Sequence, residues 1–208
     1  HGIEAIALHG DLEQRDRDQV LIQFANRSVS VLVATDVAAR GLDIAQLEAV
    51  INVDVTPDPE VHIHRIGRTG RGDAEGLALN LASMDEMGRV GNIELLQGQE
   101  SSWLKLSELA PASNKPLEPP MITIQILGGK KEKIRPGDVL GALTGEAGLQ
   151  GSQIGKINVT DFHTYVAVER GIAGKAVAQL NAVKVKGKKV KARLLKDVLA
   201  TAAQDARR

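Results

Sequence analysis

Four side chains between residues 64 and 71 could contact a phosphate group: His64, Arg65, Arg68 and Arg71. The same stretch holds two glycines, and arginines held beside glycine turns suit the binding of a polyanionic phosphate. If the stretch is helical, Arg68 and Arg71 lie three residues apart and share one face. Two guanidinium groups on one face can meet a single phosphoryl group during its transfer, so this spacing predicts a pair of arginine fingers.

A second dense block of polar and small residues lies upstream, at residues 33–44, and contains Thr35, Asp36 and Asp43. A single histidine on a helix is usually a core or surface residue, but the two arginines and this second block favour a functional His64. Asp43 could instead cap the following turn. The alternating charges around Arg15 are typical of a solvated helix face, so we interpret Arg15 as structural.

The first half of the chain alternates strand-like and helix-like segments. Strand patterns fall at residues 4–8, 29–35, 49–53 and 77–82, and the second of these is apolar and β-branched, as in a strand buried on both faces. The alternation predicts a parallel α/β sheet, in which ligands bind at the carboxyl ends of the strands. Both motif blocks follow strands or lie on the helices after them.

Two helices are predicted between these strands. The first is capped by Asp11, with Gln14 at its third position. Its buried stripe consists of Val20, Leu21 and Phe24. The second helix has Pro59 in its first turn and continues through Arg71.

Residues 98–120 lose this periodicity and end in a cluster of prolines, which indicates a linker. Trp103 and Leu104 lie within it, and we expect them to pack against the first domain. After the linker, strands are predicted at residues 122–127, 154–159, 165–168 and 190–195. Helices are predicted from Pro136 and over residues 173–180. This βαββαβ order is that of an α+β domain of the RNA-recognition-motif type.

The charge is divided between the two halves. Residues 1–120 carry 10 Lys and Arg against 19 Asp and Glu, a balance of −9, whereas residues 121–196 carry 14 against 5, a balance of +9. An acidic half joined to a basic half suggests that only the second is built to lie on a large polyanion. Residues 197–208 form a neutral tail.

Composition narrows the class of protein further. The chain has no cysteine, which excludes disulfides and thiolate metal sites and fits a cytoplasmic protein. No apolar run reaches the ~18 residues of a membrane span. The chain begins at His1 without a Met, so we expect a piece cut from a longer protein.

The first half resembles the second RecA-like domain of a DEAD-box RNA helicase over residues 4–82. The segment His9-Gly10-Asp11-Leu12, with Gln14 and Arg17, is similar to the family's Gln-x-x-Arg motif. Residues 33–44 and 64–71 are similar to its fifth and sixth motifs. The basic domain resembles that of the DEAD-box protein A subfamily, whose signature of Gly-Gly-Lys-Lys followed by Arg-Pro-Gly-Asp-Val-Leu-Gly-Ala-Leu-Thr-Gly matches residues 128–145.

The resemblance implies a role for each matching residue. Arg68 and Arg71 correspond to the arginines on the γ-phosphate of ATP, Asp43 to the ribose contact, and His64 to the residue that couples the ATP site to RNA. Gly10, Arg17, Thr35 and Asp36 correspond to residues along the RNA backbone. A carboxylate is unsuited to touch phosphate, so Asp36 is expected to orient an arginine or accept a 2′-OH.

The parts that hold the triphosphate are absent from the sequence. It has no Gly-x-x-x-x-Gly-Lys-Ser/Thr loop and no Asp-Glu-Ala-Asp box. ATP and Mg²⁺ would therefore be bound mainly by a preceding motor domain, and no metal site is expected in this chain. Without that domain the fragment should not hydrolyse ATP.

RNA contacts in the basic domain are expected to depend on lysines, because the whole chain has two Phe, one Tyr and one Trp. A first cluster lies next to a Gly-Gly turn and consists of Lys130, Lys131, Lys133 and Arg135. Tyr165 could stack one base or lie with its ring in the core. The lysines of residues 184–191 could be RNA contacts or a solvated edge that prevents aggregation.

Together these features predict a truncated RecA-like motor domain at residues 1–97, a linker at 98–120 and an RNA-binding domain at 121–196. The resemblance implies the C-terminal part of an ATP-dependent RNA helicase, acting as a monomer on a hairpin of 23S ribosomal RNA in the maturing large subunit. Two alternatives stay open: a non-enzymatic RNA-binding scaffold, and a DNA-directed motor with the same motifs.

Overall fold

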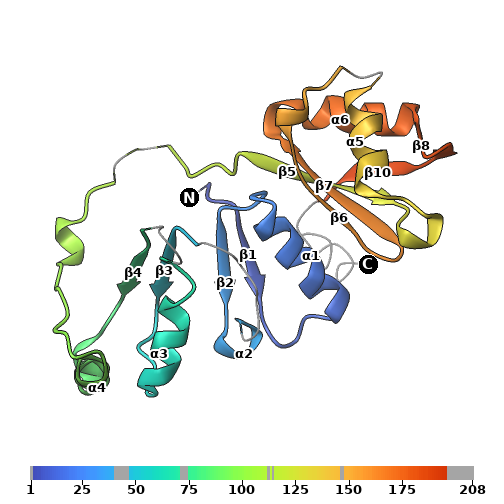
Figure 1. The fold of residues 1–208 in the computed structure, drawn as a ribbon. Helices are drawn as coiled ribbons and strands as arrows, with labels where there is room; N and C mark the ends of the chain where they lie inside the picture. The colour runs from blue at the N-terminus through green and yellow to red at the C-terminus, as the bar shows by residue number, and fades with distance from the viewer. Residues whose placement is uncertain are drawn as a thin grey trace, which may run out of the picture. The chain divides into compact units, whose positions relative to one another are not determined.

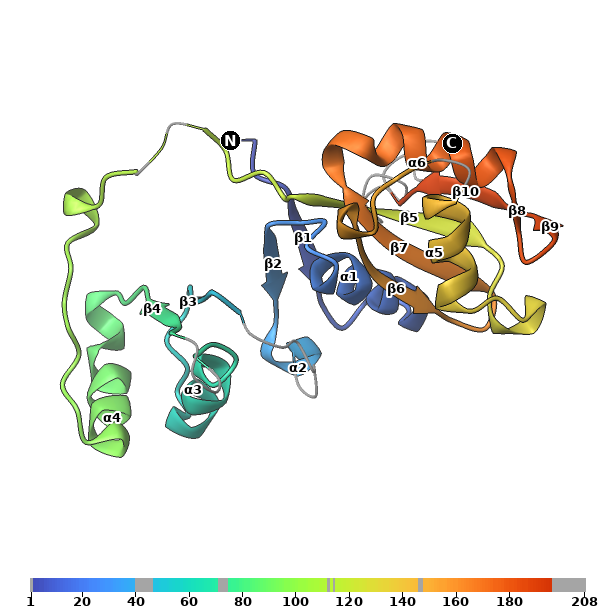
Figure 2. The same ribbon diagram turned by 45° about the horizontal axis from the view of Figure 1, so that its top comes forward.

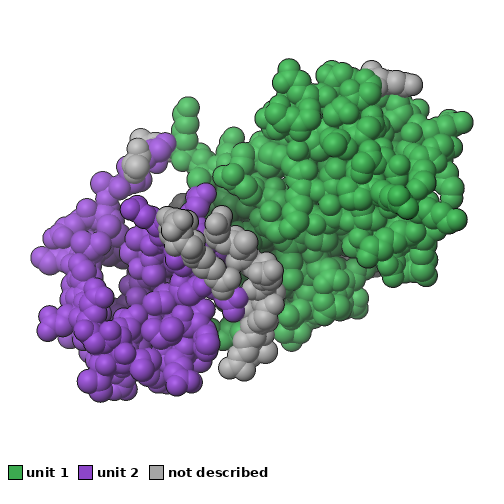
Figure 3. Space-filling view, in the orientation of Figure 1, with its two compact units in different colours: residues 1–41, 115–208 green, residues 42–114 purple. Residues whose placement is uncertain are grey.

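The computed structural model describes residues 2–39, 47–70, 75–111, 113, 115–145 and 148–195. The chain divides into two compact units, one of residues 1–41 with 115–208 and the other of residues 42–114 (Figure 3). The first unit therefore joins the beginning of the motor half to the basic region. The predicted domain boundary at residue 97 stays a prediction.

Four short strands of the motor half pair in parallel, as their alternation with helices predicted. In the first unit β1 (Ala5–Leu8) pairs with β2 (Val31–Ala34), and in the second β3 (Ala49–Asn52) pairs with β4 (Leu77–Asn80). Within the described residues they form two two-stranded sheets. The expectation that β2 is buried on both faces is wrong, because β1 is its only described neighbour and Val33 remains 61% exposed.

Helix α1 (Gln14–Ala25) connects β1 to β2, since parallel neighbours need a crossover. The predicted cap at Asp11 is wrong: the N-cap residue is Glu13, and the Asp11 carboxylate lies 3.5 Å from His9 Nδ1. On the helix, Val20 is buried as predicted. The other buried residues are Gln19 and Gln23, whereas the predicted Leu21 and Phe24 are half-buried.

Helix α3 (Pro59–Ile66) has Pro59 in its first turn, where the missing N–H removes no bond. Asp58 caps it by accepting a hydrogen bond from the backbone N–H of Glu60 at 2.9 Å. The helix ends at Ile66, with Gly67 as its C-cap residue. The predicted continuation through Arg71 is therefore wrong.

Two further helices, α2 (Asp36–Ala39) and α4 (Met87–Gln97), complete the described motor half. Residues 98–111 then contain only one 3-10 turn, at Leu106–Glu108. The expectation that Trp103 and Leu104 pack against a domain is wrong, because they remain 56% and 66% exposed. No helix in the described ranges is long and apolar enough to span a membrane.

The basic region forms a four-stranded antiparallel sheet in the order β10-β5-β7-β6 (Figures 1 and 2). Its elements follow the predicted order of strand, helix, strand, strand, helix, strand, with a short hairpin before the last strand. They are β5 (Met121–Leu127), α5 (Pro136–Thr144), β6 (Ile154–Val159), β7 (His163–Glu169), α6 (Ala173–Ala182), β8 (Lys184–Val185), β9 (Lys188–Lys189) and β10 (Lys191–Leu194).

Both helices of the basic region cover the same face of its sheet. Alternate residues of β5 and β7 point into one core, among them Ile124, Ile126 and Val166, all fully buried. Leu143 of α5 and Leu180 of α6 close this core from the other side. This packing follows from the period of two in the strands, which sends successive side chains to opposite faces.

Candidate functional site

The described residues expected to line RNA in the motor half lie in one place. Gly10 is in the turn after β1, Thr35 directly follows β2, and Asp36 opens α2. Because β1 and β2 are parallel neighbours, their carboxyl ends meet at the same edge. Arg17 joins this edge from α1, where its guanidinium donates to the carbonyl of Ala38 at 3.4 Å.

The histidines of α3 have different surroundings although they are two residues apart. His64 is exposed, whereas His62 retains 4% of its surface. Burial lowers the pKa of His62, and the nearby Arg65 guanidinium lowers it further. His64 is thus the one that a ligand could reach, while His62 has a packing role.

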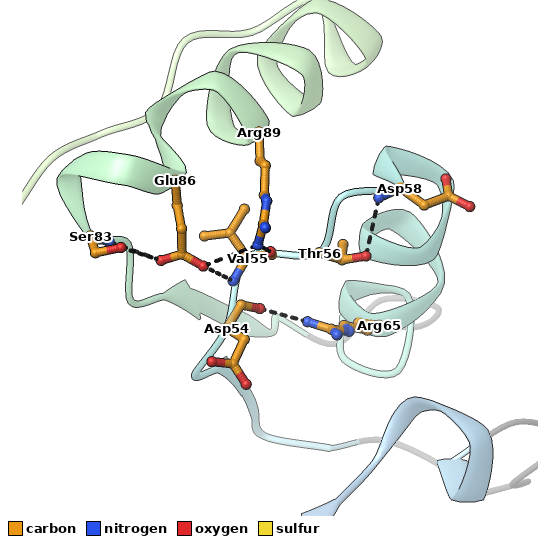
Figure 4. Close-up of polar contacts among 8 residues, drawn as sticks. All are labelled: Asp54, Val55, Thr56, Asp58, Arg65, Ser83, Glu86 and Arg89. Carbon is orange, nitrogen blue, oxygen red and sulfur yellow. Dashed lines mark hydrogen bonds and ion pairs between the residues drawn. The ribbon is translucent and has the colours of Figure 1, made fainter.

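A polar network holds the loop between β3 and α3 (Figure 4). The Glu86 carboxylate accepts hydrogen bonds from the N–H of Val55 at 3.1 Å and from the N–H and hydroxyl of Ser83 at 3.0 and 2.8 Å. These bonds lower the pKa of Glu86, the bond from the Ser83 backbone first. Arg89 donates to the Val55 carbonyl at 2.9 Å, so both backbone polar groups of Val55 are fixed from α4 and the turn before it.

Arg65 belongs to this network. Its guanidinium donates to the carbonyl of Asp54 at 2.9 Å and to the side chain of Asn52 at 3.4 Å. Arg65 thereby attaches α3 to the end of β3 and places His64 relative to the sheet. Sequence reasoning missed this support, although Ser83 and Glu86 have the spacing of a capping box.

The segment after α3 is held by β-bridge contacts. The carbonyl of Arg68 accepts from the N–H of Leu47 at 3.2 Å, and the hydroxyl of Thr69 donates to the Leu47 carbonyl. Gly76 packs closely against this segment, because a Cβ added at Gly76 would be 2.2 Å from the backbone N of Gly70. The predicted common helical face of Arg68 and its partner is wrong, because Arg68 lies beyond the end of α3. Asp43 and Arg71 lie outside the described residues.

In the basic region, two glycines allow a lysine-bearing turn to lie against the β6–β7 connection. A Cβ at Gly129 would be 2.3 Å from the Thr160 carbonyl oxygen. The N–H of Lys130 donates to this same oxygen at 2.9 Å, and that of Lys131 donates to the Asp161 carbonyl at 3.0 Å. The backbone of the turn is therefore fixed while its lysine side chains stay exposed.

The two lysine clusters adjoin one another. Lys186, at the tip of the β8–β9 hairpin, donates to the carbonyl of Lys133 and lies 3.8 Å from the Asp138 carboxylate. Lys131 lies over the ring of Phe162, with its ammonium 4.1 Å from the ring centroid. We call the surface formed by Lys130, Lys131, Lys133, Arg135, Phe162 and Lys186 the lysine surface.

The two aromatic residues near β7 differ in access. Phe162 is 58% exposed on the lysine surface, whereas Tyr165 is 4% exposed on the face of the sheet opposite the helices. The Tyr165 hydroxyl lies 3.4 Å from Gln125 Nε2, and Arg193 Nε donates to Gln125 Oε1 at 2.9 Å. Of the two, only Phe162 offers a ring face to a base without rearrangement. The sequence signal for the exposure of Phe162 was its position next to Asp161, in the turn before β7.

Two family models match the chain. The helicase conserved C-terminal domain matches residues 1–73, and the DbpA RNA-binding domain matches residues 123–194. The chain is 54% identical over 199 residues to the ATP-dependent RNA helicase DbpA of Escherichia coli, covering 94% of this chain and 42% of that protein. It is 32% identical over 204 residues to DbpA of Bacillus subtilis, covering 88% and 43%.

A solved structure of the E. coli DEAD-box protein SrmB bound to regulator of ribonuclease activity A is 33% identical, covers 56% of this chain and 69% of that one, and has a TM-score of 0.49. The chain spans less than half the length of both curated DbpA relatives. The two family models and the similarity to the curated DbpA proteins show that the chain belongs to the DEAD-box family of RNA helicases. Its second domain identifies the subfamily as that of DbpA.

Proposed function

We propose that this chain is the C-terminal part of an enzyme that couples ATP hydrolysis to RNA unwinding. The observation that carries the proposal is the presence, in one chain, of a helicase C-terminal domain and a DbpA RNA-binding domain. The grouping of Gly10, Arg17, Thr35 and Asp36 at one sheet edge supports it further. Such an edge is where a parallel α/β sheet binds its ligand.

ATP supplies the phosphoryl group that is transferred to water in this reaction. The residues of this chain that would hold it are Arg68 and Arg71 at the γ-phosphate and Asp43 at the ribose, with His64 as the coupling residue. Guanidinium groups suit the phosphates. Mg²⁺ would be bound mainly by a preceding motor domain; within the described ranges no group of three acidic or histidine side chains lies close enough together to hold a metal ion.

The RNA substrate we propose is a hairpin of 23S ribosomal RNA in the maturing large subunit, bound in the cytoplasm by a monomer. The support is the subfamily, the +9 balance of residues 121–196 and the fixed backbone of the lysine surface. Phosphate contacts dominate the affinity of such a charged surface, whereas firmly positioned groups give it specificity. The sheet and helix order supports an RNA-recognition-motif-like domain.

The arginine fingers give the main test. In a full-length protein that includes the preceding motor domain, Arg68→Ala or Arg71→Ala should slow RNA-stimulated ATP hydrolysis by ~10³-fold or more. Arg15→Ala is the matched control, because Arg15 is exposed on α1 and is assigned no contact with ATP or RNA. Hairpin binding should be unchanged in all three variants. Near-normal hydrolysis by both finger variants would contradict the proposal.

The two alternatives give different results in the same preparation. A non-enzymatic scaffold would show no RNA-stimulated hydrolysis even in the full-length wild type. If the protein is a DNA-directed motor, a deoxyribose version of the hairpin would stimulate ATP hydrolysis and would compete equally with the RNA hairpin for binding. The 208-residue chain alone should bind the hairpin and hydrolyse no ATP, since its sequence has no phosphate loop.

A further inference from the structure

In the sheet of the RNA-binding domain, the two central strands β5 and β7 are buried on both faces. Its helices cover one side, and on the other side Thr123, Gln125, Tyr165 and Ala167 retain only 1%, 0%, 4% and 1% of their surface. These residues alternate with the core positions of β5 and β7, so they point away from the helices. Something other than α5 and α6 therefore buries this second face.

The segment at the end of α1 contacts the second face through buried polar groups. Asn26 Nδ2 donates to the Thr123 hydroxyl at 3.1 Å, and the hydroxyls of Ser28 and Thr123 lie 2.7 Å apart. Asn158 of β6 donates to Asn26 Oδ1 at 3.2 Å. Asn26, Ser28 and Thr123 are 2%, 7% and 1% exposed, so these bonds are shielded from water.

The end of the linker is fixed to the same segment. The N–H of Met121 donates to the Arg27 carbonyl at 3.3 Å, and the Ser30 hydroxyl donates to the Leu117 carbonyl at 2.9 Å. Arg170 donates to the carbonyl of Pro119 and pairs with the Glu4 carboxylate, both at 2.9 Å. Both ribbon views place α1 beside the sheet formed by β5, β6 and β7 (Figures 1 and 2).

Satisfied polar groups of this kind specify one arrangement. A buried hydroxyl or amide that loses its partner costs about 1–3 kcal/mol, and three such groups from distant parts of the chain meet here. An apolar contact could slide, whereas these bonds require one register. The contact is thus a specific interface within the first unit.

We propose that the second face of this sheet is a docking surface for residues 4–30 of the motor half, and that RNA binds instead at the lysine surface. The RNA part of this inference rests on the proposed function; the docking part does not. The consequence is that a bound hairpin is held in a fixed position relative to α1, which carries Arg17. The buried Tyr165 then has a role in docking instead of base stacking.

A disulfide tests the docking. The chain has no cysteine, so in Ser28→Cys/Thr123→Cys only the introduced pair can be oxidised. The two hydroxyl oxygens are 2.7 Å apart, close to the ~2.05 Å of a disulfide bond, so mild oxidation should cross-link nearly all of the chain. The control is Ser28→Cys/Thr144→Cys, because Thr144 is on α5, behind the other face of the sheet. It should remain reduced.

The cross-linked chain then tests where RNA binds. With a labelled 23S ribosomal RNA stem-loop as the probe, cross-linking should change affinity by less than about twofold. Failure to cross-link would overturn the docking surface, and a loss of affinity that reductant restores would show that RNA needs this face. If the reduced chain binds no RNA but cross-links, the proposed function fails and the docking surface stands.

Tyr165 provides a second readout that needs no cysteine, because it is the single tyrosine of the chain. Nitration measured by mass spectrometry should be slow in the wild type. Thr123→Val removes the partner of Asn26 and Ser28 and should raise the nitration rate by about tenfold. Thr164→Val, a buried threonine that bonds Gly128 within the domain, should not. Equal rates in both variants, or fast nitration of the wild type, would overturn the docking surface.

Discussion

The RNA-binding domain and the second unit differ in how completely they bury their own apolar residues. The former closes a single core in which Ile124, Leu143 and Leu180 are fully buried. Among the described residues of the second unit, the buried apolar cluster is small and consists of Val55, Val90 and Ile93. Strand residues such as Ile51 stay exposed there. The basic domain is therefore held by its packing, whereas residues 47–70 and 75–111 depend more on polar contacts such as those of Figure 4.

A core truncation should give the largest difference between the two regions. Leu143→Ala removes a fully buried side chain and should lower the free energy of unfolding of the RNA-binding domain by about 2–5 kcal/mol. Ile51→Ala should change stability by no more than about 0.5 kcal/mol, because Ile51 is 60% exposed. Denaturant titration followed by circular dichroism measures both. Equal losses would contradict the contrast.

The glycine turn should give the next largest effect. Gly129→Ala places a Cβ 2.3 Å from the Thr160 oxygen and should cost about 1–3 kcal/mol as the turn is displaced. Hairpin affinity should fall with it, because the lysine surface loses its fixed backbone. Gly137→Ala is the control, since no atom lies within 4 Å of its Cβ position. A Gly129→Ala chain with unchanged melting temperature and RNA affinity would argue against a positioned turn.

A smaller loss is expected in the polar network of the second unit. Glu86→Gln leaves one oxygen for the three donors supplied by Ser83 and Val55, so the loop before α3 should loosen. Amide hydrogen exchange at Val55 should speed up. Asp85→Asn, a neutralisation at the neighbouring exposed position, should leave exchange at Val55 unchanged. The same rate in both variants would mean that the network does not hold the loop.

The smallest effect should be a pH dependence in each region. Burial lowers the pKa of His163, and Arg15 and Arg193 add to this, while Glu132 opposes it. The folded state thus binds a proton less readily than the unfolded state, whose pKa is near 6.5. Stability is complete above that pH and falls as the pH drops toward the lowered value. His163→Gln should flatten the acid dependence of the first unit, and His62→Gln that of the second, in thermal melts over this range.

Local patterns were sufficient where one element decides its own structure. Residues 154–159 were predicted as a strand with the observed bounds, and the β-branched residues Ile154, Ile157 and Val159 lie within it. The lysine turn was predicted from its glycines, and the structure adds the reason, which is close approach of the backbone at Gly129. The grouping of Gly10 with Thr35 followed from the parallel pairing of β1 with β2.

Predictions failed where distant residues decide the outcome. The end of α3 at Ile66 depends on Leu47, which draws residues 68 and 69 into a β-bridge. The burial of Tyr165 depends on a face that residues near position 26 contact. A cap at Asp11 would start α1 at residue 12, but the helix starts at Gln14. The local sequence around Asp11 does not reveal this later start. The first two are tertiary effects that override a local preference.

The contact between residues 4–30 and the end of the linker has a consequence for chain connectivity. The polypeptide leaves the first unit after residue 41 and returns to it at residue 115, so the second unit is an insertion between two parts of one body. A single proteolytic cut among residues 98–111 would separate the chain into two fragments without breaking the bonds of Asn26, Ser28 and Glu4 to their partners. The nicked molecule should therefore remain a non-covalent pair, as in fragment complementation, with its RNA-binding domain retained by the docking contact.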